Sequence, residues 1–241
     1  GRWRLDYMVN ASIAIIPARG GSKRIPGKNM IEFCGKPMIA WTIEAAIRSG
    51  IFTKILVSTD CKEIAKISKE FGAEVPFLRE KFSDDMTPVS AATNDALQKA
   101  EKYWSINFST VTQLMPNCPL RNHKDIIVAM NTFETKNRDF QISCFKFEWM
   151  NPWWSFKFKE NNDHEFMFPG AINNRSQDLD NLFCPTGSIW IAKSKKLQNS
   201  KSFYGDGFKF EPLNWISAVD IDNYEDLNFA KALKNFDNQS I

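Results

Sequence analysis

The stretch from residue 13 to residue 29, IAIIPARGGSKRIPGKN, constrains this chain more than any other. It opens with an apolar run, Ile13 to Ile16, which is typical of a strand buried on both faces. Pro17 ends this strand, and Gly20 and Gly21 are expected to let the backbone turn sharply and approach a ligand closely. The sequence therefore predicts a buried first strand that leads into a glycine-rich loop.

This loop is rich in positive charge. Its cations are Arg19, Lys23, Arg24 and Lys28, and Ser22 and Asn29 lie among them. Such loops at the end of a strand often bind phosphate in α/β proteins. The P-loop pattern G-x-x-x-x-G-K-[ST] is absent, because Ser22 stands at its first glycine and Asn29 at its last position, and G-x-G-x-x-G is absent too. We predict a phosphate site, and an ordinary basic surface loop is the alternative.

The rest of the chain alternates between strand-like and helical patterns. Strands are predicted at 13–16, 54–59, 108–114, 139–147, 185–192 and 215–221, and helices at 38–50, 61–72, within 83–104, at 123–133 and at 223–236. Asp60 is expected to cap the helix at 61–72. This order predicts an α/β fold with a mostly parallel sheet flanked by helices.

Composition narrows the class of protein further. The 241 residues, 43% of them hydrophobic, suit one domain (1–241). The net charge of +3, dispersed outside the loop, favours small anionic ligands over nucleic acid. Five cysteines without a C-x-x-C pair suggest reduced thiols in a cytoplasmic protein. No apolar run approaches the roughly 20 residues of a membrane span, so no membrane partner is expected.

Two carboxylates follow the last predicted strand. Alternation along that strand would point Asp220 and Asp222 to one face and Ile221 to the other. Two like charges so close repel each other unless a cation or protons intervene. Because Mg²⁺ typically takes one or two carboxylates together with substrate phosphates, a Mg²⁺ site is predicted here. The alternative is that Asp222 caps the last helix.

The segment PARGGSKRIPGKN, followed by GKPMIAWTIEAA, resembles the N-terminal signature of cytidylyltransferases that activate nine-carbon acidic sugars. These are the CMP-sialic acid synthetases and their relatives acting on legionaminic and pseudaminic acid, with the CMP-Kdo synthetases more distant. The resemblance continues to the end of the chain. It implies a Rossmann-like nucleotide-diphospho-sugar transferase fold and a reaction in which CMP passes from CTP to the sugar and pyrophosphate is released.

The resemblance also implies roles for individual residues. The nucleotide would be bound by the loop residues Arg19, Gly20, Gly21, Ser22 and Lys23, which would hold its triphosphate. Lys28 would stabilise charge at the α-phosphate, and Asn29 would place the ribose or the base. Arg79 would reach the nucleotide from another segment. A surface ion pair is the alternative for Arg79. Ser90 is the best match to a hydroxyl that bonds cytosine, with Thr87 as the alternative. The chemistry would rest on Arg19, Lys28 and Asp222, with Mg²⁺ on Asp220 and Asp222 and no covalent nucleophile.

The acceptor sugar is expected to meet a different loop. The segment MPNCPLR resembles the family's Q-P-T-S-P-L-R loop, whose glutamine contacts the sugar. Met115 stands at that position, and Asn117 is a candidate to replace the lost amide, which leaves the identity of the sugar open. Arg121 is expected to orient this loop or to cap a helix end.

Residues 148–182 differ in character from the rest, because Trp and Phe alternate there with Asn, Lys and Glu. An aromatic hairpin of this kind is poorly stable alone and usually packs on a partner. The resemblance implies an excursion that forms a homodimer. Arg175 and Gln177 would then reach the partner's sugar site, with the planar guanidinium of Arg175 pairing the sugar carboxylate. A small core folded back on its own subunit is the alternative.

The predicted function is therefore that of a CMP-nonulosonate synthetase, with CTP, a nine-carbon acidic sugar and Mg²⁺ as its small-molecule partners. Within enzymes, the alternative is a CMP-Kdo synthetase-like protein or another sugar nucleotidyltransferase. From another class, the chain could be a nucleotide-sensing module that kept the loop and lost turnover.

Overall fold

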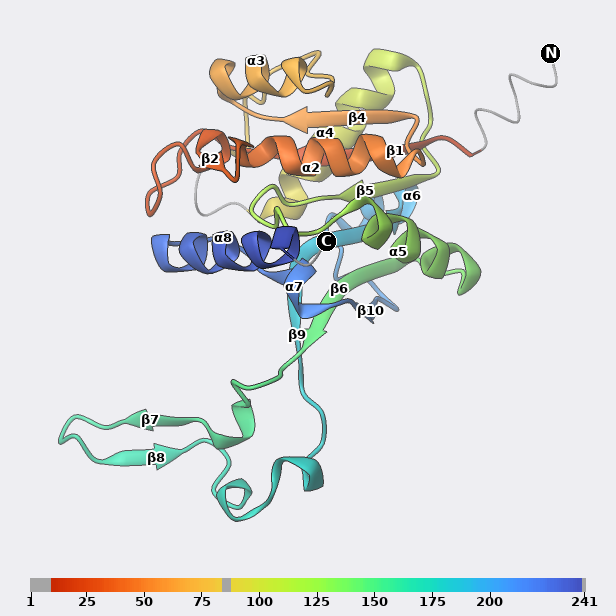
Figure 1. Cartoon of the computed structure of the whole chain (residues 1–241). Helices are drawn as coiled ribbons and strands as arrows, with labels where there is room; N and C mark the ends of the chain where they lie inside the picture. The colour runs from red at the N-terminus through yellow and green to blue at the C-terminus, as the bar shows by residue number, and fades with distance from the viewer. Residues whose placement is uncertain (1–9, 84–87, 240–241) are drawn as a thin grey trace.

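The computed structural model describes residues 10–83 and 88–239. A six-stranded sheet in the order β10-β6-β9-β5-β1-β4 forms its centre (Figure 1). The strands are β1 (Ser12–Pro17), β4 (Lys54–Ser58), β5 (Thr110–Gln113), β6 (Phe140–Lys146), β9 (Phe183–Lys193) and β10 (Lys209–Pro212). Within this sheet, only β9 runs antiparallel to its neighbours, β5 and β6. The predicted mostly parallel α/β sheet is confirmed.

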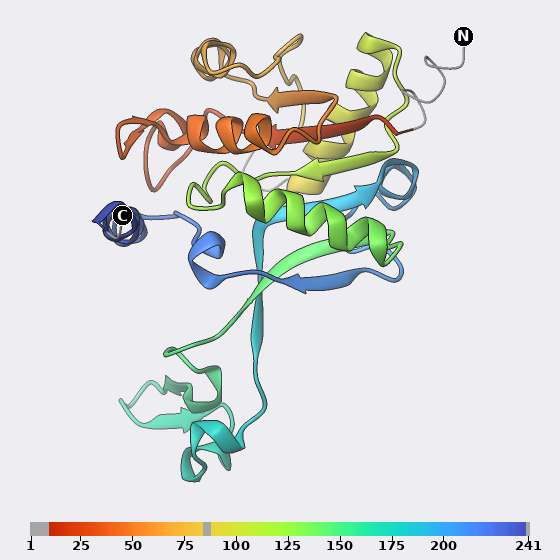
Figure 2. The same ribbon diagram turned by 45° about the vertical axis from the view of Figure 1, so that its right-hand side comes forward.

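Helices cover both faces of the sheet (Figure 2). The helices α2 (Met38–Ser49), α3 (Lys62–Glu70) and α5 (His123–Thr135) pack into one apolar cluster, and α4 (Val89–Trp104) and α6 (Ser194–Ser200) into another. Strand β1 contributes to both clusters, since Ala14 and Ile16 point into the first and Ile13 and Ile15 into the second. This double burial explains why β1 is apolar without alternation.

The loop after β1 has its own small elements: η1 (Lys28–Met30), β2 (Glu32–Phe33) and β3 (Lys36–Pro37). The last helix, α8 (Tyr224–Gln239), packs on this loop rather than on the sheet. Its Leu227 and Ala230 join Ile25 and Phe33 in a third apolar cluster. The loop after β1 and the last helix, which are far apart in the sequence, are thereby brought together. None of the helices in the described ranges is both long enough and apolar enough to cross a membrane.

The prediction of a strand at 215–221 is wrong. Its first half forms a short helix, α7 (Trp215–Ala218), whose first turn is capped by Asn214 through the N–H of Ile216. Two hydroxyls of β9 then donate to the end of α7, Ser188 Oγ to the carbonyl of Ser217 and Thr186 Oγ1 to that of Ala218. These polar contacts outweigh the β-propensity of the apolar run. Asp220 and Asp222 consequently lie on the α7–α8 loop.

Between β6 and β9 the chain leaves the α/β body (Figure 1). This excursion contains η2 (Pro152–Trp154), β7 (Phe156–Phe158), β8 (His164–Phe166), η3 (Ala171–Asn173) and η4 (Ser176–Asp178). It has internal contacts of its own, for example from Trp153 Nε1 to the carbonyl of Asp180 at 2.8 Å. Both views show it extending away from the sheet, so it does not pack on the α/β body of its own chain. Phe158 and Trp149 are about three-quarters exposed, at 73% and 77%.

Arg121 joins three parts of the body and is itself only 1% exposed. Its Nε donates to the carbonyl of Ser188 on β9 at 2.9 Å, its Nη1 to Thr42 Oγ1 on α2 at 2.9 Å, and its Nη2 to the carbonyl of Met115 at 2.6 Å. Burial lowers the pKa of Arg121 to about 10, which leaves it charged at neutral pH. The expectation that Arg121 orients the β5–α5 loop is confirmed.

We expect Arg121→Met to lower the free energy of unfolding by at least about 2 kcal/mol, because it leaves three buried acceptors without their donor. Urea unfolding followed by circular dichroism measures this change. Arg48→Met, at an exposed position of α2, is the matched control and should stay within about 0.5 kcal/mol of the parent. Equal stabilities for the two variants would contradict the structural role given to Arg121.

Candidate active site

A cavity of about 170 Å³ opens at the carboxyl ends of β1 and β5, where ligands of open α/β sheets bind. The predicted site residues that line it are Arg19, Ser22, Lys28, Asn29, Arg79, Met115 and Asn117. Apolar side chains complete the wall, among them Phe82 and Val89. The structure thus gathers these seven residues, from three separate stretches of the chain, around one space.

The glycines of the loop act differently from the expectation. A Cβ on Gly20 would lie 2.9 Å from the Cβ of Cys61, so the close approach is to the β4–α3 corner and not to a ligand. Gly21 faces open space. Gly27 has the left-handed conformation, at φ 64°, and precedes the short helix η1. That turn directs Lys28 and Asn29 into the cavity.

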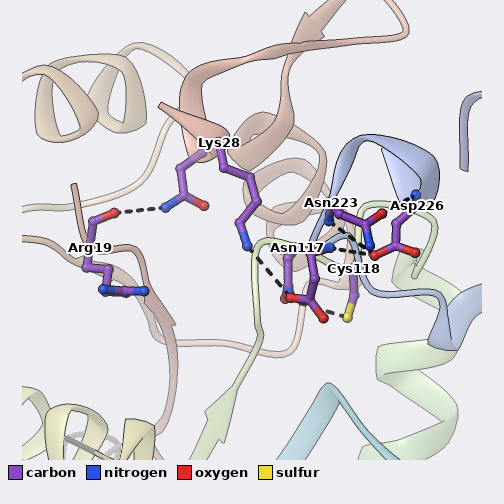
Figure 3. A network of polar contacts seen from close by, with 8 residues as sticks. Arg19, Lys28, Asn117, Cys118, Asn223 and Asp226 are labelled. Atoms are coloured by element: carbon purple, nitrogen blue, oxygen red, sulfur yellow. Dashed lines mark hydrogen bonds and ion pairs between the residues drawn. The ribbon is translucent and has the colours of Figure 1, made fainter. Parts of the chain in front are cut away.

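Lys28 meets an acidic residue of the α7–α8 loop, which is distant in the sequence (Figure 3). Its Nζ lies 3.9 Å from Asp222 Oδ1. Burial lowers the pKa of Lys28, and the charge of Asp222 works in the opposite direction. Both side chains are partly accessible, at 18% and 39%, so an incoming anion can reach the pair. A half-buried ammonium group beside a cavity is suited to bind a phosphoryl oxygen.

Asn29 beside it is 7% exposed and leaves an acceptor unused. Its Nδ2 donates to the carbonyl of Arg19 at 3.2 Å, which fixes the orientation of the amide (Figure 3). Its Oδ1 is buried and has no hydrogen-bond partner among the described residues. Buried polar atoms are usually satisfied. The Oδ1 of Asn29 is therefore placed to accept a hydrogen bond from a ligand.

The acidic segment is held in place by its neighbours. The N–H of Ile221 donates to the carbonyl of Asn117 at 2.8 Å, which ties this segment to the β5–α5 loop. Helix α8 is capped by Asn223 and Asp226: Asn223 Oδ1 accepts the N–H of Asp226, and Asp226 Oδ2 accepts those of Asp222 and Asn223 (Figure 3). The alternative that Asp222 caps this helix is therefore wrong, and its carboxylate faces Lys28 instead.

Asp220 and Asp222 together could hold a metal ion. The surrounding protein raises the pKa of Asp220 by desolvation, and the charge of Asp222 raises it further. This repulsion is relieved by a cation between the two carboxylates. No group of three or more His, Cys, Asp or Glu suited to a metal occurs among residues 10–83 and 88–239. A two-carboxylate site fits Mg²⁺ whose other positions are filled by phosphate oxygens and water.

Arg79 is buried rather than part of a surface ion pair, at 8% exposure. Its guanidinium donates to the hydroxyl and carbonyl of Ser58, at 3.2 and 2.7 Å, and to the carbonyl of Phe82 at 2.9 Å. Ser90 is buried in the first turn of α4, next to the cavity-lining Val89. Thr87, the alternative to Ser90, lies outside the described residues.

The predicted sugar contacts fall in two places. Met115 and Asn117 line the cavity, and Met115 is fixed through its backbone to Gly187 and Arg121. Arg175 and Gln177 instead lie at η4 of the excursion, away from the cavity (Figures 1 and 2). The Nε of Arg175 donates to Asp178 at 3.0 Å, and its side chain is 74% exposed. Within one chain, Arg175 and Gln177 therefore do not reach the cavity.

Sequence reasoning missed Asp60 as a part of this site. It was expected to cap α3, yet Cys61 holds the cap position and Asp60 Oδ1 accepts the N–H of Gly20 at 2.8 Å. The sequence did contain a signal for this contact: Asp60 follows β4 directly, and in a parallel sheet the end of β4 lies beside the end of β1. Phe82, Val89 and Pro116 were missed as well, since apolar wall residues carry no recognisable motif.

A mostly parallel α/β sheet with a cationic loop, a buried arginine and an acidic pair at one end is the arrangement of an α/β protein suited to bind a nucleotide. A family model described as "Cytidylyltransferase" matches residues 13–236. The chain belongs to this family, as its N-terminal signature predicted.

Several relatives are similar, two of them along nearly their whole length. The chain is 34% identical to the pseudaminic acid cytidylyltransferase of Campylobacter jejuni, over 95% of this chain and 98% of the relative. It is 34% identical to the CMP-N,N'-diacetyllegionaminic acid synthase of Legionella pneumophila, with the same coverage. It is 33% identical to an N-acylneuraminate cytidylyltransferase of Streptococcus agalactiae, over 89% of this chain and 51% of the relative.

Solved structures share the fold at lower identity. A CMP:2-keto-3-deoxy-manno-octonic acid synthetase complexed with CTP superposes with a TM-score of 0.70 at 16% identity, covering 95% of this chain and all of the other. A cytidylyltransferase from Leptospira borgpetersenii gives a TM-score of 0.61 at 17% identity, covering 94% and 87%. The predicted nucleotide-sugar transferase fold is confirmed.

Proposed function

We propose that this cytidylyltransferase transfers CMP from CTP to a nine-carbon acidic sugar of the pseudaminic, legionaminic or sialic acid type and releases pyrophosphate. The observation that carries the proposal is the meeting of Lys28 and Asp222, 3.9 Å apart, near the cavity that the cationic loop lines. The full-length similarity to enzymes named for pseudaminic and legionaminic acids supports the acceptor class.

The residues at the cavity suit an in-line displacement at the α-phosphorus, with the sugar's anomeric hydroxyl attacking and pyrophosphate leaving. Such a reaction depends on positioning and charge neutralisation. Arg19, Ser22 and Lys23 would hold the triphosphate, and Lys28 would stabilise the charge that develops on the α-phosphate. Asn29 would accept a hydrogen bond from a ribose hydroxyl or the cytosine amine through its unpartnered Oδ1.

The proposal includes Mg²⁺ held by Asp220 and Asp222. When bound, Mg²⁺ would neutralise phosphate charge and lower the pKa of the attacking hydroxyl. The chain's contribution is to fix the backbone of the loop that carries both carboxylates, through the bonds of Ile221 to Asn117 and of Asp226 to the backbone of Asp222. Arg79 and Ser90 would complete the nucleotide site, and Met115 and Asn117 would contact the sugar.

The proposal also includes a homodimer formed through the excursion. Its aromatic side chains are exposed, and apolar surface of this extent usually has a partner. Arg175 and Gln177 lie too far from their own cavity to serve it, so they would act at the site of the other subunit (Figure 1). There the planar guanidinium of Arg175 would pair with the sugar carboxylate.

The direct test is a pyrophosphate-release assay with CTP, Mg²⁺ and a panel of pseudaminic, N,N'-diacetyllegionaminic and N-acetylneuraminic acids and Kdo. We expect release with a nine-carbon acid, and a kcat reduced at least about 100-fold in Lys28→Met, because the charge at the α-phosphate loses its counter-ion. Lys62→Met, an exposed lysine of α3, should keep parental turnover.

Other outcomes of this panel favour the alternatives. Fastest release with Kdo would point to a CMP-Kdo synthetase-like enzyme. Tight CTP binding without release on any acid would point to a nucleotide-sensing module. Near-parental turnover of Lys28→Met would remove Lys28 from the proposed chemistry.

Asp222→Asn and Asn223→Ala should separate metal binding from helix capping. We expect Asp222→Asn to raise the Mg²⁺ concentration needed for half-maximal activity at least tenfold, because the site loses one of its two charges, while the free energy of unfolding changes little. Asn223→Ala should instead lose about 1 kcal/mol of stability with an unchanged Mg²⁺ titration. An unshifted titration in Asp222→Asn would contradict the proposed metal site.

Dilution tests the proposed action across subunits. We expect specific activity to fall as the protein is diluted below its dimer dissociation constant, measured by analytical ultracentrifugation. Arg175→Met should raise the KM for the sugar and leave that for CTP unchanged, whereas Lys157→Met, an exposed cation of the same excursion, should change neither. A monomer with full activity would refute the arrangement.

A further inference from the structure

The carboxyl end of β4 holds two parts of the cavity wall at once. Ser58, the last residue of β4, accepts two hydrogen bonds from the guanidinium of Arg79 and a third, from the N–H of Ala18, at its carbonyl. The carbonyl of Thr59 accepts the N–H of Arg79 at 2.7 Å. The short segment after β4 is therefore the common support of Arg79 and of the loop after β1.

The next residue, Asp60, fixes the turn of that loop. Its Oδ1 accepts the N–H of Gly20 at 2.8 Å. Gly20 also rests on Cys61, because a Cβ at Gly20 would lie only 2.9 Å from the Cβ of Cys61. Its neighbours Arg19 and Ser22 both line the cavity. The position of Gly20 therefore sets where these two side chains enter the site.

The charge of Asp60 makes this contact unusual for a site that receives an anion. Asp60 is exposed, and its carboxylate acts on the nearby Arg79, whose pKa burial lowers and Asp60 raises. A negative charge at this place repels a triphosphate. The hydrogen bond to Gly20 and the charge thus have opposite effects on nucleotide binding, and an asparagine would separate them, since its Oδ1 can accept the same N–H.

We propose that Asp60 is a positioning residue for nucleotide binding. Its Oδ1 holds the Gly20 turn so that Arg19 and Ser22 face the cavity, and the Ser58–Cys61 segment joins this turn to Arg79 as one unit. This inference rests on the proposed function in one respect, which is that the nucleotide bound at the cavity is CTP.

The first experiment compares Asp60→Ala with Asp60→Asn by calorimetric titration of CTP and by steady-state kinetics. Asp60→Ala should weaken CTP binding about tenfold or more, because the turn loses its acceptor. The KM for CTP should rise while that for the acceptor sugar stays the same. Asp60→Asn should bind CTP as well as the parent or more tightly. Asp95→Ala, which removes another carboxylate acting on Arg79, is the control and should leave CTP binding unchanged.

A second experiment tests the turn without touching Asp60. Gly20→Ala should weaken CTP binding, because its Cβ collides with that of Cys61. Cys61→Gly removes the colliding atom, so the double variant should regain most of the lost affinity. A purely structural role for the turn would instead change stability without this recovery of affinity.

The outcomes distinguish the two proposals. If the parent binds CTP and Asp60→Ala binds it equally well, the role given to Asp60 is overturned and the proposed function stands. If Asp60→Asn is as impaired as Asp60→Ala, the positioning bond is not the cause and the inference also fails. If the parent itself does not bind CTP, the proposed function and the inference fall together.

Discussion

The site depends on an ion pair between two segments that are far apart in the sequence. Lys28 follows the first strand of the sheet and Asp222 precedes the last helix, and their charged atoms lie 3.9 Å apart. This proximity requires α8 to pack on the loop after β1, where Leu227 and Ile25 share one apolar cluster. The ion pair itself contributes little stability at this exposure. Its importance is that it places opposite charges where a phosphate and a metal would need them.

Buried arginines give the cavity its rigid walls. Arg79 and Arg121 are both less than 9% exposed, and most of their hydrogen bonds go to backbone carbonyls rather than to carboxylates. A guanidinium can fix several carbonyls at once because its donors form a rigid planar fork. The loops that form the cavity also have local turn bonds, such as those from the N–H of Lys28 to the carbonyl of Ile25 and from the N–H of Cys118 to the carbonyl of Met115. The side chains of Arg79 and Arg121 therefore hold these loops in place, as backbone hydrogen bonds between strands do within a sheet.

Much of this arrangement could be predicted from the sequence, and the failures have physical causes. The apolar run of β1 and the cations after it identified the loop, because local patterns encode both features. The run from Trp215 was mistaken for a strand, since its helix depends on hydroxyls of β9 that are distant in sequence. Asp60 was read as a helix cap for the same reason: its partner, Gly20, comes from another strand–loop unit.

Strand β9 connects the excursion to the α/β body. It begins at Phe183, where the excursion returns, and continues into the middle of the sheet (Figure 1). Within β9, the hydroxyls of Thr186 and Ser188 donate hydrogen bonds to the end of α7, just before the loop that carries Asp220 and Asp222. The carbonyl of Gly187 accepts the N–H of Met115. One extended backbone therefore connects the excursion to the α7 helix before the acidic loop and to the β5–α5 loop, on two sides of the cavity.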